Sequence, residues 1–266
     1  MNKWNIVLGP PGTGKTTYLL NTVEKLFDSG IGPHELAYVA FTKKAATEAL
    51  TRAITKFDYA EDSYTYFRTI HSLCYFWQGL TKADILDRKD LRTFSKLVGE
   101  KISSAWDGEN LMALNSKGDK MVFLENMARN TCVDYKLFWQ LANSDISWMH
   151  FDWFVQSYNN FKETNFLLDY TDMLSGFLDM DTSPMLRALI VDEAQDLSAL
   201  QWKCVHKLAR NVENVYIAGD DDQAIYKWAG ADTEHFINLD GKEIYLDQSY
   251  RVPRRVHDVA LNIVSR

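Results

Sequence analysis

The segment Gly9-Pro10-Pro11-Gly12-Thr13-Gly14-Lys15-Thr16 carries residue types that together bind phosphate. It fits the pattern G-x-x-x-x-G-K-[ST], in which glycines allow successive backbone N–H groups to turn towards phosphate oxygens. Where such a loop opens a helix, the helix dipole adds to the attraction. Lys15 would reach the β- and γ-phosphates of a nucleotide, and the hydroxyl of Thr16 would ligate magnesium. The whole segment is therefore a candidate site for ATP and Mg2+.

A phosphate loop needs a carboxylate on a neighbouring strand, and Asp192 and Glu193 follow an apolar run that ends at Val191. Asp192 would hold Mg2+, and Glu193 would orient or deprotonate the attacking water. Two adjacent acids after a strand are often only the charged pair at a helix N-terminus. Their combination with the phosphate loop favours hydrolysis of ATP.

A third polar segment follows the apolar run at residues 215–218, and it contains Gln223. A side-chain amide at this place could sense whether a γ-phosphate is present. Tyr226 and Trp228 come directly afterwards, on either side of Lys227. Such an aromatic pair is more often part of a core than a platform for bases, so both interpretations stay open.

The elements that must position these residues alternate along the chain. Apolar runs typical of strands occupy residues 4–8, 36–41, 186–191, 215–218 and 243–246. Helical spacing marks residues 14–26, 45–54 and 200–208. Alternating strands and helices predict an α/β fold, with a parallel sheet covered by helices on both faces.

Residues 80–166 differ from both ends, because they show helical patterns and almost no β-branched runs. We expect a mostly helical inserted subdomain there, within a discontinuous ATP-binding domain formed by residues 1–79 and 167–266. Five of the eight tryptophans fall at positions 77–153, namely Trp77, Trp106, Trp139, Trp148 and Trp153. They could stack on bases, but filling a small core is the favoured interpretation.

Length and composition set further limits. The 266 residues suggest about two compact units at roughly 150 residues per domain. With 29 basic and 36 acidic side chains the net charge is −7, so the chain lacks the basic excess of a protein that coats nucleic acid by charge alone. Three scattered cysteines argue against a disulfide framework, and no apolar run approaches the roughly 18 residues of a membrane span. We therefore expect a soluble, cytoplasmic chain without a membrane partner.

The chain resembles the UvrD/Rep-type superfamily 1 DNA helicases in a series of motifs that follow the order of that family. They are Gly9–Thr16, Ala40-Phe41-Thr42-Lys43-Lys44-Ala45-Ala46, Thr69-Ile70-His71-Ser72, Asp169-Tyr170-Thr171-Asp172, Val191-Asp192-Glu193-Ala194-Gln195-Asp196, residues 219–230, and Leu246-Asp247-Gln248-Ser249-Tyr250-Arg251. The resemblance covers both ends of the chain and includes the helical middle by position only; compact phage-encoded members are closest in style. It implies a RecA-like domain with an inserted subdomain, and an ATP-dependent helicase or translocase motor coupled to single-stranded DNA.

The resemblance also implies roles for individual residues. Gln223 would sense the γ-phosphate, Tyr250 would stack on the adenine, and Arg251 would contact the γ-phosphate from the far side. Residues expected to meet single-stranded DNA, by stacking or phosphate contact, are Phe41, Thr42, Lys43, Thr69, His71, Ser72, Tyr226 and Trp228. Simple burial of Phe41 and a helix-start hydrogen bond by His71 remain the alternatives.

The chain departs from the family pattern at several places. Thr17 stands where an arginine often packs on the adenine, and Ala229 stands where an arginine commonly follows the tryptophan. The family usually has a segment upstream of the phosphate loop whose glutamine reads the adenine edge, and here the first strand is expected to begin within a few residues of Met1. After Arg251 only a short helical pattern at residues 256–264 remains, so we expect a second RecA-like domain to come from the rest of a longer chain or from a partner.

Two other functions fit parts of the sequence. A nucleotide-gated module that binds single-stranded DNA or protein with little turnover is the alternative, because Arg251 alone would leave the transition state incompletely surrounded. A small-molecule kinase on the same loop is disfavoured, because no segment resembles an acceptor-binding lid and Glu193 suits activation of water.

Overall fold

A computed structural model describes residues 4–103, 114–220 and 230–251. The chain divides into two compact units. The sheet unit comprises residues 1–73, 182–197 and 205–266, and the helical unit comprises residues 74–181 and 198–204. The helical unit is thus larger than the expected insertion at 80–166, since it includes α8 (Tyr170–Asp179) and the start of α9 (Ala199–Ala209).

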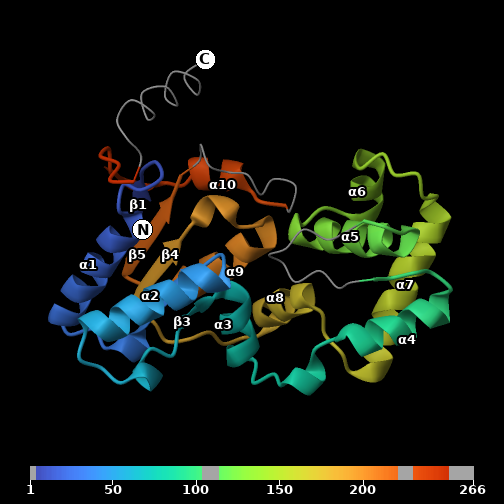
Figure 1. Ribbon diagram of the computed structural model, residues 1–266, viewed down its shortest axis with the longest axis horizontal. Coiled ribbons are helices and arrows are strands. Elements are labelled where there is room, and N and C mark those ends of the chain that lie inside the picture. Colours follow the sequence, from blue (N-terminus) through green and yellow to red (C-terminus); the bar gives the residue numbers. More distant parts are fainter. Residues whose placement is uncertain (1–3, 104–113, 221–229, 252–266) are drawn as a thin grey trace, which may run out of the picture. The chain divides into compact units, whose positions relative to one another are not determined.

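The sheet unit is built on six parallel strands in the order β3-β2-β4-β5-β1-β6. They are β1 (Trp4–Leu8), β2 (Leu36–Ala40), β3 (Phe67–Thr69), β4 (Ala188–Asp192), β5 (Asn214–Gly219) and β6 (Gly241–Tyr245). Figure 1 labels β1, β3, β4 and β5 of this sheet. The predicted α/β fold is confirmed, and five strands lie within two or three residues of their expected bounds. The sequence did not indicate β3, because three residues are too few to show a pattern.

Both faces of the sheet are buried along its inner strands β2, β4 and β5, whereas the edge strand β6 is largely exposed. On one face α1 (Lys15–Asp28) and α2 (Lys43–Lys56) contribute Leu19, Val23 and Ala49 to a core that also contains Leu36 and Ile190 of the strands. Side chains alternate along a strand, so the intervening residues point to the opposite face. Those residues are equally shielded from solvent, as for Ile6, Ala37, Val39, Leu189, Val191, Val215 and Ile217. A parallel sheet buried on both sides explains why its strands appear as continuous apolar runs.

The strand register brings the carboxyl ends of the strands to one edge of the sheet. Ala40 at the end of β2 pairs with Thr69 of β3 on one side and with Asp192 of β4 on the other. Leu8 at the end of β1 pairs with Gly219 of β5 and with Tyr245 of β6. The loops that carry the sequence motifs therefore leave the sheet at the same edge, where ligands of parallel α/β sheets bind.

The helical unit consists of short and medium helices. They are α4 (Arg88–Val98), α5 (Lys117–Asn130), α6 (Tyr135–Leu141), α7 (Trp148–Asn165) and α8. Trp139 packs against Trp148 with ring centroids 5.7 Å apart, whereas Trp153 is 46% exposed and Trp106 lies outside the described residues. Two further α-helices of the described residues are α3 (Ile70–Trp77) and α10 (Thr233–Ile237). Short 3-10 helices occupy Pro33–Glu35, Glu61–Ser63, Lys82–Asp84 and Ala194–Asp196. None of the helices described is both long and apolar enough to cross a membrane.

A cluster of buried charges joins three helices of the helical unit. Arg129 of α5 donates to Asp169 and Asp172 at 2.5 and 2.6 Å, and to Glu125 at 2.9 Å. Lys162 of α7 reaches the same two aspartates at 2.7 and 2.6 Å. Asp169 also caps α8, since its side chain accepts from the Asp172 backbone N–H. The motif at residues 169–172 therefore begins a helix and supplies the counter-ions for the buried Lys162 and for Arg129, whose side chain is 16% exposed.

Candidate nucleotide-binding site

The loop after β1 turns directly into α1, whose first residue is Lys15. Gly12 and Gly14 have φ angles of 77° and 85°, which favour glycine over residues with a Cβ. Gly14 is the N-cap of α1 and supplies no side-chain cap, so the first backbone N–H groups of the helix remain for a ligand. Lys15 is only 8% exposed, and its ammonium group donates to the Gly9 carbonyl oxygen at 2.7 Å.

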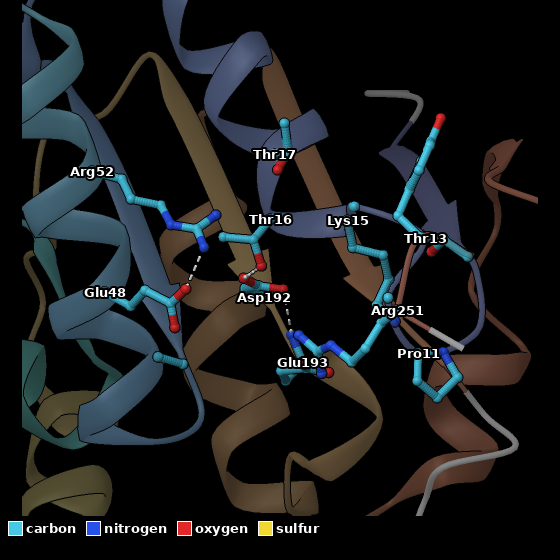
Figure 2. A pocket seen from close by; sticks show the side chains of 14 residues that line it. Pro11, Thr13, Lys15, Thr16, Thr17, Glu48, Arg52, Asp192, Glu193 and Arg251 are labelled. Atoms are coloured by element: carbon cyan, nitrogen blue, oxygen red, sulfur yellow. Dashed lines mark hydrogen bonds and ion pairs between the residues drawn. The ribbon is translucent and has the colours of Figure 1, made fainter. Parts of the chain in front are cut away.

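Thr16 and Asp192 come together at the mouth of this loop (Figure 2). The Thr16 hydroxyl donates to Asp192 Oδ2 at 3.2 Å, and the buried Tyr38 hydroxyl of β2 donates to the same oxygen at 2.7 Å. Burial, and then repulsion by Glu193, raise the pKa of Asp192, while both hydroxyls oppose that shift. A hydroxyl beside a carboxylate is the oxygen donor set that Mg2+ prefers, so these residues fit the predicted metal.

Glu193 follows in a strained backbone conformation, with a φ of 54° that is uncommon for a residue with a side chain. Its carboxylate accepts a hydrogen bond from Gln195 Nε2 at 3.0 Å. The other end of that amide, Gln195 Oε1, accepts from the Asp220 backbone N–H at 3.1 Å. Burial, and then repulsion by Glu193, raise the pKa of Asp196 to about 7. Gln195 therefore ties the acid after β4 to the residue after β5, a link that the sequence did not reveal.

The segment that ends the described chain docks on the phosphate loop. The Tyr250 backbone N–H donates to the Gly12 carbonyl at 2.8 Å, and the Ser249 hydroxyl donates to the Pro11 carbonyl at 2.7 Å. A Cβ on Gly12 would overlap the Cβ of Arg251. This contact explains why a glycine is needed at that position and brings Tyr250 and Arg251 to the edge of the loop.

These elements enclose a cavity of about 490 Å³. Its lining comprises Pro11, Gly12, Thr13, Gly14, Lys15, Thr16, Thr17, Ala45, Glu48, Arg52, Asp192, Glu193, Tyr250 and Arg251. Gly9 and Pro10 do not line it, although Gly9 holds Lys15; Gln223 lies outside the described residues. Sequence reasoning missed Tyr38, Glu48 and Arg52. The four-residue spacing of Glu48 and Arg52, on a helix that starts at the binding edge, was the available signal.

Three of the residues predicted to contact DNA, Phe41, Thr42 and His71, are buried or make hydrogen bonds within the chain. Phe41 is 5% exposed and His71 is 9% exposed. The Thr42 hydroxyl accepts from the Ala45 backbone N–H at 3.2 Å and so caps α2. Burial of Phe41, one of the two alternatives left by the sequence, is thus what the structure shows, and its contact with DNA stays a prediction.

The remaining DNA candidates lie nearby or outside the described part. Thr69 accepts from the backbone N–H of Ser72 at 3.2 Å, and the Ser72 hydroxyl accepts from Arg68 at 3.4 Å. Lys43 is an exposed residue that opens α2. Tyr226 and Trp228 fall outside the described residues. Their roles in binding DNA also stay predictions.

The fold and the cavity define a P-loop nucleotide-binding domain of the RecA-like type. Residues 1–243 match the family model of the UvrD/REP helicase N-terminal domain, and the chain belongs to that family. The resemblance inferred from the motifs is thereby confirmed.

Several curated relatives are similar over nearly the whole chain. A "Probable DNA helicase" of Mycoplasma pneumoniae is 28% identical over 289 residues, covering 99% of this chain and 53% of the relative. The "ATP-dependent DNA helicase PcrA" of Bacillus subtilis is 25% identical, covering 97% of this chain and 37% of the relative. The "ATP-dependent DNA helicase Rep" of Buchnera aphidicola is 23% identical, covering 98% and 40%. The chain thus spans about half or less of the length of these relatives.

Proposed function

We propose that this chain is the N-terminal part of an ATP-dependent DNA helicase or translocase motor, which hydrolyses ATP with Mg2+ when single-stranded DNA is bound. One observation carries the proposal. The Thr16 hydroxyl and the Asp192 carboxylate lie 3.2 Å apart at the end of the phosphate loop, and Glu193 lines the same cavity. The names of the relatives support ATP as the nucleotide and DNA as the second ligand.

The chain's own residues divide the work of hydrolysis. Lys15 exchanges the Gly9 carbonyl for the β- and γ-phosphate oxygens, and the N–H groups of the loop surround the same phosphates. Thr16 and Asp192 would hold Mg2+, which neutralises phosphate charge when bound. Glu193 accepts a proton from the attacking water. The water oxygen bonds to the γ-phosphorus as the bond between the γ-phosphorus and the leaving ADP oxygen breaks. Arg251 stabilises the charge that develops on the γ-phosphate.

Coupling to DNA belongs to the same proposal. Phe41, Lys43, His71 and Trp228 are the first candidates to test for contact with a single strand. Because the relatives are about two to three times as long as this chain, the second RecA-like domain would come from the rest of a longer protein or from a partner. The sheet unit would then bind ATP against that second domain.

The test is Mg2+-dependent ATP hydrolysis by the purified chain, with and without single-stranded DNA. We expect Lys15→Ala to weaken ATP binding and abolish turnover, whereas Glu193→Gln should retain binding and lose turnover. Lys25→Ala, an exposed lysine later on the same helix, is the matched control and should change neither.

The outcomes separate the candidate functions. Stimulation by DNA that both substitutions abolish would support a coupled motor domain. Nucleotide-dependent binding of DNA without turnover would favour the nucleotide-gated binding module, with closure of the site left to the second domain. Failure to bind any nucleotide would contradict both.

A further inference from the structure

Glu48 and Arg52 form an ion pair inside the nucleotide cavity. They lie one helical turn apart on α2, and Arg52 Nη2 contacts Glu48 Oε1 at 2.5 Å. Both side chains line the cavity together with Thr16 and Asp192. Figure 2 shows the Arg52 guanidinium extending from α2 towards Thr16. The pair therefore faces the place where phosphates and metal would bind.

The charges that line this cavity are balanced without a ligand. Three cations, Lys15, Arg52 and Arg251, face three carboxylates, Glu48, Asp192 and Glu193. Lys15 is hydrogen-bonded to an uncharged carbonyl, whereas Arg52 is held by a carboxylate. A nucleoside triphosphate brings several negative charges, so when it binds, its phosphate oxygens compete with the Glu48 carboxylate for Arg52.

The pair is weak enough to exchange. Its side chains are 47% and 49% exposed, and ion pairs of this kind on a helix surface contribute little to stability. A guanidinium bound to phosphate gains two parallel charge-assisted hydrogen bonds, which are stronger. Arg52 can thus leave Glu48 for a phosphate without a large loss to the fold.

We propose that Arg52 binds the terminal phosphate of the nucleoside triphosphate, and that Glu48 holds Arg52 and masks its charge while the cavity contains no nucleotide. This inference rests on the proposed ATP site and adds a phosphate-binding residue to it. It requires the two members of the pair to have opposite effects. Removing Arg52 weakens triphosphate binding, and removing the charge of Glu48 strengthens it.

The test measures binding, not turnover. Fluorescently labelled ADP and a labelled non-hydrolysable ATP analogue are titrated with the full chain and Mg2+, and anisotropy is recorded. We expect Arg52→Gln to weaken binding of the ATP analogue about tenfold, the scale of one hydrogen bond between charged groups, and to change ADP binding less than about twofold. Glu48→Gln should tighten binding of the ATP analogue by about threefold, because a competing negative charge is removed.

Lys56→Gln is the matched control, because Lys56 lies one turn after Arg52 on α2 and pairs with Glu24 at 2.9 Å without lining the cavity. It should leave both affinities unchanged, and thermal melting of each variant checks folding. Equal effects of Arg52→Gln on the two nucleotides, or changes of the same sign for Arg52→Gln and Glu48→Gln, would overturn the inference while the proposed function stands. A wild-type chain that binds neither nucleotide would overturn both.

Discussion

Replacing Arg129 by methionine should destabilise the helical unit by about 3 kcal/mol, because three carboxylates would lose a shared counter-ion. The Asp169 and Glu125 side chains are 7% and 0% exposed, and that of Asp172 is 22% exposed. Breaking a buried ion pair by removing one partner costs about 3–5 kcal/mol. Methionine retains much of the side-chain volume, so the change tests charge more than packing.

The lower end of that range follows from the groups that remain. Lys162 still contacts Asp169 and Asp172 at 2.7 and 2.6 Å, so neither aspartate is left alone. Glu125 loses Arg129 altogether. Burial already raises the pKa of Glu125 against the attraction of Arg129, so without that cation the carboxyl can become protonated, which limits the loss.

Native-state hydrogen exchange of the amides in α5, α7 and α8 measures this loss locally, and urea unfolding of the full chain measures it globally. Lys120→Met is the matched control on the same helix. Its ion pair with Asp145, at 3.1 Å, has side chains 40% and 64% exposed, so the change should leave the free energy of unfolding nearly unchanged. A loss below about 1 kcal/mol for Arg129→Met, or one equal to the control, would refute the view that this cluster stabilises the unit.

The same cluster predicts a loss of stability in acid. Burial alone would raise the pKa of Asp169, but Arg129 and Lys162 outweigh it and hold that pKa well below its usual range. A depressed folded-state pKa contributes stability that is complete above the unfolded value of about 3.9 and is lost as the pH falls below it. The urea concentration at the midpoint of unfolding should therefore decrease as the pH is lowered from about 5 to about 2, and it should decrease less steeply for Arg129→Met. A wild-type midpoint that rises on acidification would contradict this.

Two further substitutions test the nucleotide site. Tyr38→Phe removes a hydrogen bond to Asp192 and should raise the Mg2+ concentration needed for half-maximal ATP hydrolysis by about tenfold. Tyr64→Phe, at another buried tyrosine, should leave that concentration unchanged. Direct binding of Mn2+, measured by electron paramagnetic resonance, gives the same comparison without turnover. Gly12→Ala forces a Cβ against Arg251 at a φ of 77° and should lower stability by at least about 1 kcal/mol, measured by urea unfolding together with ATP affinity. An unchanged Mg2+ requirement in the first variant, or wild-type stability in the second, would count against these contacts.

The site residues that could be predicted from the sequence are those whose roles depend on neighbours close by in the chain. The phosphate loop, the strand before it and the helix after it are contiguous, so the pattern alone places Lys15 at a helix start. Asp192 and Glu193 were found because an apolar strand ends directly before them. By contrast, Gln195 lies in a predicted motif, yet its link to Asp220 depends on how β4 and β5 lie side by side.

A motif match identifies which residue occupies a family position, but it does not show whether the side chain of that residue is exposed. Phe41 matches a position that meets DNA in the family, yet here it is 5% exposed. The Thr42 hydroxyl oxygen accepts the hydrogen bond that caps α2, whereas a contact with a phosphate would use the O–H of the same group as a donor. A threonine or serine at a helix start fits both roles, so the sequence cannot distinguish a cap from a DNA contact.

Tyr38 shows why a residue that contacts Asp192 from a neighbouring strand could not be predicted. In the sequence it is one aromatic residue within the apolar run at residues 36–41, which is typical of a core strand. Its hydroxyl reaches Asp192 only because β2 lies beside β4, in a register that pairs Ala40 with Asp192. That neighbour relation joins strands separated by more than a hundred residues, and local periodicity contains no information about it. The same strand order places α2 beside the cavity, so the four-residue spacing of Glu48 and Arg52 indicates an ion pair on α2 but does not by itself show that the pair lines the site.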